Sequence, residues 1–148
     1  MRGPVSSAAA VGRDRVALFA LFSGIGGARM ALERLGADVA LHVSAEIDPA
    51  ACRVLRGRWP DVKEVGAFEN LTEAAIFSLL GTAPHLALVL VVGGSPCQGV
   101  TRVNVAAAGW HDQRTQLVRH ILRVARTIRR VGPQVVVRQL VENVASMS

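Results

Sequence analysis

The sequence predicts an α/β fold built on a doubly wound, mostly parallel sheet. Two observations predict it. Short aliphatic and β-branched runs, typical of strands buried on both faces, alternate with amphipathic segments of helical period. Glycine, proline and aspartate mark the junctions, and no internal repeat or linker interrupts the alternation. Because crossover connections between parallel strands are right-handed, we expect the strands in the order 3-2-1-4-5.

The composition indicates a single folded domain. Of the 148 residues, 51% are hydrophobic and 19% are charged, which provides enough apolar material for a core. We expect residues 1–14 to be a disordered leader, whose composition leaves a transit peptide open, and residues 15–148 to form the domain. No apolar run reaches transmembrane length, so we expect no membrane partner.

The net charge and the number of cysteines indicate which class of binding partner and which cellular compartment to expect. The net charge of +6 permits a polyanionic partner such as nucleic acid. Cys52 and Cys97 are the only cysteines, too few for a disulfide scaffold, so we expect an intracellular location. The histidines lack metal-ligand spacing, so we expect no metal site. We interpret all four as surface or incidental residues: His42, His85, His111 and His120.

The first strand is expected at residues 16–21, and a glycine-rich turn follows it at once. This turn is Phe22-Ser23-Gly24-Ile25-Gly26-Gly27. Glycines at a strand-to-helix turn allow positive φ and close approach of a ligand. Arg29 stands where a dinucleotide fingerprint has its third glycine, which argues against NAD or FAD and leaves a smaller adenosine-type ligand.

The helix after this turn is expected to end at Gly36 and to bury one apolar face. The residues of that face are Ala28, Ala31, Leu32 and Leu35. The next strand, residues 39–45, ends in Glu46, about 20 positions beyond the glycine turn, where a carboxylate can accept hydrogen bonds from ribose hydroxyls. Ile47 could pack on a flat adenine face, whereas Asp48 is explained by capping the following helix.

The middle of the chain carries two further strands and a helix. Residues 59–61 break the second helix, and residues 62–65 suggest a short edge strand. Asn70 or Thr72 is expected to cap the third helix, which ends near Gly81. The fourth strand, residues 86–92, is an aliphatic run ended by glycines.

A rigid step after the fourth strand presents one cysteine. Pro96 fixes its own φ, so Cys97 would be held at the carboxyl end of the strand. A thiol there can act as a nucleophile if its surroundings favour the thiolate. The alternative is a small buried hydrophobe, which is what most free cysteines are.

The last two elements complete the predicted sheet. Residues 113–130 have a clean apolar stripe at helical spacing, and we interpret the arginines on another face of this helix as solvated. A fifth strand is expected at residues 134–141 and ends in Glu142-Asn143-Val144. With strands one and four side by side, the glycine turn, Glu46, Cys97 and Glu142 would converge on one crevice.

Four segments, in this order and at these strand ends, resemble motifs of the cytosine-5 DNA methyltransferase family. The turn from Phe22 to Gly27 is similar to the motif that wraps S-adenosylmethionine. Glu46 matches the residue that holds the ribose, and Ile47 the one that packs on the adenine. Pro96-Cys97 matches the motif that carries the nucleophile, and Glu142-Asn143-Val144 the glutamate-asparagine-valine motif. The resemblance covers nearly the whole chain after residue 15.

The resemblance implies a Rossmann-like, S-adenosylmethionine-dependent methyltransferase that methylates carbon 5 of cytosine in DNA. Cys97 would attack carbon 6 of the base, and Glu142 would share a proton with ring N3. Members of the family flip the target base out of the duplex. The location would be nuclear in a eukaryote and otherwise cytoplasmic.

Two departures from the family pattern bear on these expectations. Ala67 stands where the family has an aspartate that contacts the adenine amino group, and Glu69 is a possible substitute. The chain looks like the N-terminal part of a catalytic domain, incomplete at its C-terminus. Methylation of tRNA and a catalytically inactive cofactor- or partner-binding fragment therefore stay open. A cysteine hydrolase is disfavoured because no histidine can be placed beside Cys97.

Overall fold

Five parallel strands form one sheet in the predicted order, β3-β2-β1-β4-β5. The computed structural model describes residues 15–94 and 113–142, apart from the side chains of residues 113–117. Along the chain the elements are β1 (Arg15–Leu21), α1 (Gly27–Arg34), β2 (Asp38–Ala45), α2 (Pro49–Arg58), β3 (Lys63–Glu64), η1 (Phe68–Asn70), α3 (Glu73–Gly81), β4 (Leu86–Gly94), α4 (Gln113–Val131) and β5 (Val136–Glu142).

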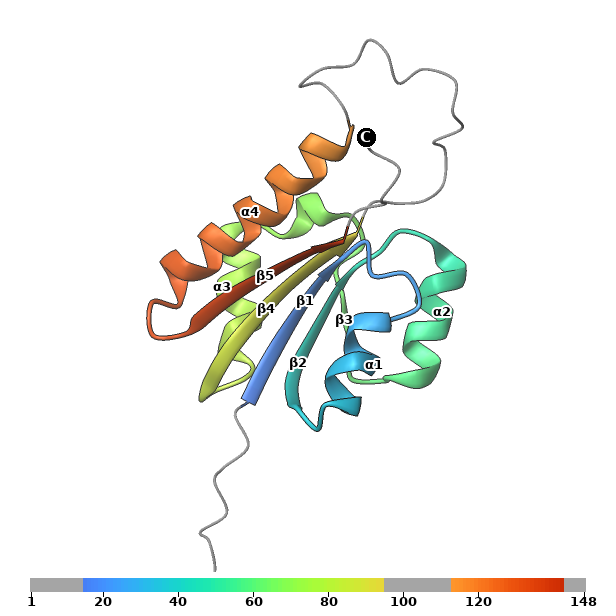
Figure 1. The fold of residues 1–148 in the computed structure, drawn as a ribbon, viewed down its shortest axis with the longest axis horizontal. Coiled ribbons are helices and arrows are strands. Elements are labelled where there is room, and N and C mark those ends of the chain that lie inside the picture. Colours follow the sequence, from blue (N-terminus) through green and yellow to red (C-terminus); the bar gives the residue numbers. More distant parts are fainter. Residues whose placement is uncertain (1–14, 95–112, 143–148) are drawn as a thin grey trace, which may run out of the picture.

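Helices cover both faces of the sheet, with α1 and α2 on one face and α3 and α4 on the other (Figure 1). The face under α3 and α4 carries the larger apolar core, in which Phe19 and Val91 of the central strands meet Ile76 of α3 and Ile128 of α4, all fully buried. The apolar stripe predicted for α4 is confirmed at Ile121, Val124 and Ile128.

Strand register brings the predicted site segments to one edge of the sheet. The last residue of β1, Leu21, lies beside Ala45 of β2 and Gly93 of β4, and Gly94 lies beside Glu142 of β5. The glycine turn therefore begins at the same edge at which Glu46 and Glu142 are found. This edge is the topological switch point, where open α/β sheets bind ligands.

Element boundaries differ slightly from the prediction. Thr72 is the residue that caps α3, through a 3.2 Å hydrogen bond from the Ala75 amide to its Oγ1. The edge strand β3 is shorter than predicted. Strand β5 extends to Glu142, so this glutamate is the last residue of the strand and does not lie beyond it.

The prediction for the buried face of α1 was wrong in part: Ala28 and Leu32 are half-buried, but neither is fully buried. Ala31 is exposed, Leu35 is 82% exposed, and the buried residue of this helix is Arg29. Arg29 can be buried because Glu33 and Asp61 pair with its guanidinium, and a buried charge needs such partners.

The interpretation of His42 as a surface or incidental residue was also wrong. It lies in β2 and is 1% exposed, with its ring edge-on to Trp59 at a centroid distance of 6.0 Å.

In the described part of the chain, no helix is both long and apolar enough to cross a membrane.

Candidate functional site

The glycine turn has a backbone shape that suits glycine. Gly24 and Gly26 have φ of 51° and 89°, and Phe22, which begins the turn, also has a positive φ of 57°. The Phe22 amide donates to the Ala45 carbonyl at 2.8 Å, and the Gly26 amide closes the turn on the Ser23 carbonyl at 3.1 Å. A Cβ on Gly24 would meet no atom within 4 Å, so open space lies beside this residue.

The Glu46 carboxylate lies against the glycine turn. Its Oε2 accepts a 2.8 Å hydrogen bond from the Gly24 amide, and its Oε1 accepts 2.9 Å hydrogen bonds from the amides of Ile47 and Asp48. Three backbone donors thus fix the carboxylate, and Oε2 keeps capacity for a further donor. The two residues predicted to hold one adenosine-type ligand, Gly24 and Glu46, are therefore in direct contact.

Apolar side chains near this contact are exposed. Ile25 of the glycine turn is 61% exposed and Ile47 is 76% exposed. Exposed residues of this size offer contact surface to a flat ring. The hydroxyls of Ser23 and Ser44 lie 2.7 Å apart and connect the turn to β2.

Phe22, the first residue of the turn, is also the first member of a row of three aromatic rings, Phe22, Phe68 and His120, which sequence reasoning missed. The Phe22 ring lies 5.5 Å from that of Phe68, which lies 4.1 Å from that of His120 on α4. Arg123 donates to the carbonyls of Leu71 and Phe68 at 3.0 and 3.3 Å. Burial and the nearby Arg123 lower the pKa of His120. Phe68 belongs to no recognisable sequence motif. The only feature of the sequence that could have indicated this row is the spacing of residues 120 and 123, which places both on the same side of α4.

The segment in which the family has its adenine-contacting aspartate is a tight turn. Gly66 has a φ of 69°, and Ala67 is the N-cap of η1. The Asn70 side chain donates to the Val65 carbonyl at 2.7 Å and closes this turn. Glu69 is exposed, and its role as a substitute for the aspartate stays a prediction.

The catalytic candidates are only partly described. Pro96, Cys97, Asn143 and Val144 lie outside the described residues. Glu142 is exposed at the end of β5, where its Oε2 would lie 3.4 Å from a Cβ added to Gly94. Because Gly94 directly precedes Ser95-Pro96-Cys97, the strand that leads to the cysteine lies beside the strand that ends in this glutamate.

The site holds groups suited to an adenosine-type ligand. Among residues 15–94 and 118–142, no cluster of histidine, cysteine and acidic side chains could hold a metal ion. The open space at Gly24, the fixed Glu46 carboxylate and the exposed Ile47 lie at the switch point of the sheet. These features fit a ribose beside an apolar ring.

Comparison with a solved structure defines the fold class. Spodoptera frugiperda DNMT2, solved as a triple mutant, superposes with a TM-score of 0.54 at 24% sequence identity, covering 88% of this chain and 36% of that one. This chain therefore shares the Rossmann-like α/β fold of that protein.

Sequence comparison then gives the family. The profile of the C-5 cytosine-specific DNA methylases matches residues 16–148, and the chain belongs to this family. Type II methyltransferase M1.HphI of Haemophilus parahaemolyticus is 32% identical over 107 residues, which is 72% of this chain and 28% of that protein. M.HgiCII of Herpetosiphon aurantiacus is 37% identical over 106 residues, 72% and 22% of the two chains.

A plant relative extends the likeness. DNA (cytosine-5)-methyltransferase DRM2 of Arabidopsis thaliana is 29% identical over 119 residues, 76% of this chain and 19% of that protein. The chain thus spans about a quarter of the length of the curated relatives it matches.

Proposed function

We propose that this chain binds S-adenosylmethionine and belongs to an enzyme that methylates carbon 5 of cytosine in DNA. The observation that carries the proposal is the contact between the Glu46 carboxylate and the Gly24 amide at the switch point. Family membership supports the choice of reaction. When bound, S-adenosylmethionine would supply an electrophilic methyl group.

The proposed binding mode assigns a role to each residue of the site. The turn from Phe22 to Gly27 would pass close to the cofactor, because glycines leave room beside the backbone. Glu46 would accept hydrogen bonds from the ribose hydroxyls through the free capacity of Oε2. Ile47 would pack on the adenine. Pro96 would line the site from the cysteine-bearing segment.

The proposed chemistry assigns the covalent step to Cys97. Its thiolate would bond to carbon 6 of cytosine, which makes carbon 5 nucleophilic. Glu142 would hold a proton at ring N3, so that negative charge does not build up on the base. After methyl transfer, loss of the carbon 5 proton would return its electron pair to the ring and expel the cysteine sulfur.

The covalent step can be tested with a trapped adduct. Incubation with S-adenosylmethionine and DNA that contains 5-fluorocytosine should give a denaturation-resistant complex, because fluorine cannot leave as the proton does. Cys97→Ser should abolish the adduct and Cys52→Ser should keep it. An adduct that persists in Cys97→Ser would contradict the assignment of the nucleophile.

The same assay separates the alternatives. A 5-fluorocytosine tRNA that is trapped in place of DNA would favour the tRNA reaction. Calorimetric binding of S-adenosylmethionine without an adduct on either nucleic acid would favour a cofactor-binding module.

A further inference from the structure

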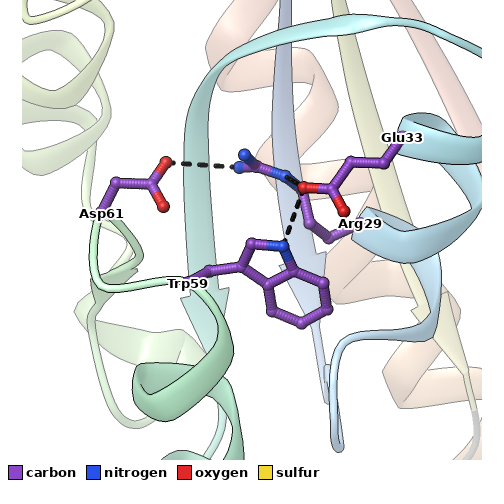
Figure 2. A network of polar contacts seen from close by, with 4 residues as sticks. All are labelled: Arg29, Glu33, Trp59 and Asp61. Atoms are coloured by element: carbon purple, nitrogen blue, oxygen red, sulfur yellow. Dashed lines mark hydrogen bonds and ion pairs between the residues drawn. The ribbon is translucent and has the colours of Figure 1, made fainter.

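A network of four residues joins α1 to the segment that follows α2 (Figure 2). Glu33 Oε1 accepts hydrogen bonds from Trp59 Nε1 at 2.8 Å and from Arg29 Nε at 2.9 Å. The other end of the Arg29 guanidinium lies 3.5 Å from Asp61 Oδ2. One carboxylate oxygen of Glu33 therefore fixes both a buried indole and a buried guanidinium.

The indole fixed in this way lies directly against the glycine turn. A Cβ added to Gly26 would come within 2.3 Å of Trp59 Cζ3 and 2.9 Å of Trp59 Cη2. Real Cβ atoms do not approach so closely, so the ring and the Gly26 backbone are in full contact with no space between them. Trp59 is 5% exposed, and the Arg58 guanidinium lies 5.1 Å from the centre of its ring.

Gly26 contacts the indole and belongs to the turn that forms part of the proposed ribose site. Its amide closes the turn on the Ser23 carbonyl at 3.1 Å, and its carbonyl accepts the first hydrogen bond of α1, from Met30. Gly24, within the same turn, donates to Glu46. A shift of the Trp59 ring would therefore move the turn whose Gly24 amide meets the Glu46 carboxylate.

We propose that Trp59, held by Glu33, is a positioning residue that sets the shape of the glycine turn and thereby the affinity for S-adenosylmethionine. Trp59 would not touch the cofactor and would act only through Gly26. The proposal rests on the proposed function. Burial raises the pKa of Glu33, but the hydrogen bonds from Arg29 and Trp59 together with the charges of Arg29 and Arg58 lower it overall, so the carboxylate stays a charged acceptor.

The test compares the affinity for S-adenosylmethionine of three variants of the full chain by calorimetry. Trp59→Leu removes both the ring contact and the hydrogen bond, and should weaken binding about tenfold, a loss comparable to one charge-assisted hydrogen bond. Glu33→Ala should weaken binding by a similar factor, because the indole N–H loses its partner. Glu33→Gln keeps an oxygen acceptor and should restore most of the affinity.

A matched control separates positioning from a loss of stability. Ile128 is fully buried under the opposite face of the sheet, so Ile128→Ala should destabilise the fold without touching the turn. At a temperature at which all variants are folded, this control should bind as the wild type does. Equal affinity of Glu33→Ala and wild type would overturn the proposal, and so would equal weakening in the control.

A second measurement does not need the cofactor. Hydrogen exchange of the Gly24 amide should be faster in Glu33→Ala than in wild type, because its bond to Glu46 would be broken more often. If the wild type fails to bind S-adenosylmethionine, the proposed function fails. Unchanged exchange in Glu33→Ala would instead show that Trp59 does not position the turn.

Discussion

At the scale of single residues, His42 is buried beside charged groups but has no hydrogen bond. Neither ring nitrogen has a partner within the described ranges. Burial and, to a smaller extent, the nearby Arg29 lower the pKa of His42 to about 4, although the charges of Asp61 and Glu33 oppose the shift. The native state therefore holds the ring neutral at pH values at which the unfolded chain already binds a proton.

This difference predicts a loss of stability in acid. Between the ordinary pKa of 6.5 and about 4, the unfolded chain binds more protons, so the free energy of unfolding should fall as the pH falls. The full effect is on the order of 3 kcal/mol. Urea unfolding of His42→Leu, followed from pH 7 to pH 4, should lack this component. His85→Asn, which changes an exposed histidine, should retain it, and identical slopes for wild type and His42→Leu would contradict the prediction.

At the scale of elements, the contact between β4 and α4 depends on a glycine. A Cβ on Gly93 would come within 2.4 Å of Ile121 Cδ1 and 2.8 Å of its Cγ1. Ile121 is fully buried, so its side chain has little room to move. Gly93 thus lets α4 pack closely on the strand that leads to the cysteine-bearing segment.

We therefore expect Gly93→Ala to destabilise the protein by about 1–3 kcal/mol through overpacking. Ile121→Ala should cost about 2–5 kcal/mol through the cavity that it leaves. The double variant should be less destabilised than the two single changes predict together, because the new methyl group fills part of that cavity. Chemical denaturation of the three variants measures the coupling, and strict additivity would show that the two residues do not compete for space.

At the scale of the whole molecule, the alternation of strands and helices was enough to predict the topology. Strand order follows from the handedness of crossovers, so the sequence needed only to mark five strands and their order. Glu46 beside the glycine turn follows from the same rule. The parts that could not be predicted depend on contacts distant in sequence: Arg29 is buried because Asp61 lies opposite, and His42 is buried because Trp59 closes over it.

Cofactor binding should stabilise the whole fold, because only the native state brings Gly24 and Glu46 together. S-adenosylmethionine at one hundred times its dissociation constant should add about 2.7 kcal/mol. For a chain of this length, that corresponds to a rise in Tm of roughly 9 °C. A thermal melt of Glu46→Ala under the same conditions should show a smaller rise. An equal rise in both proteins would contradict the role assigned to Glu46.

The three amide donors around the Glu46 carboxylate have a thermodynamic consequence. Its rotamer is already fixed before any ligand arrives, so a ribose would meet an acceptor that loses little rotational freedom on binding. The conformational entropy of the Glu46 side chain is lost when the protein folds and not when the ligand binds. The same arrangement makes an amide side chain a poor replacement, because one of its two ends would point N–H groups at backbone N–H groups.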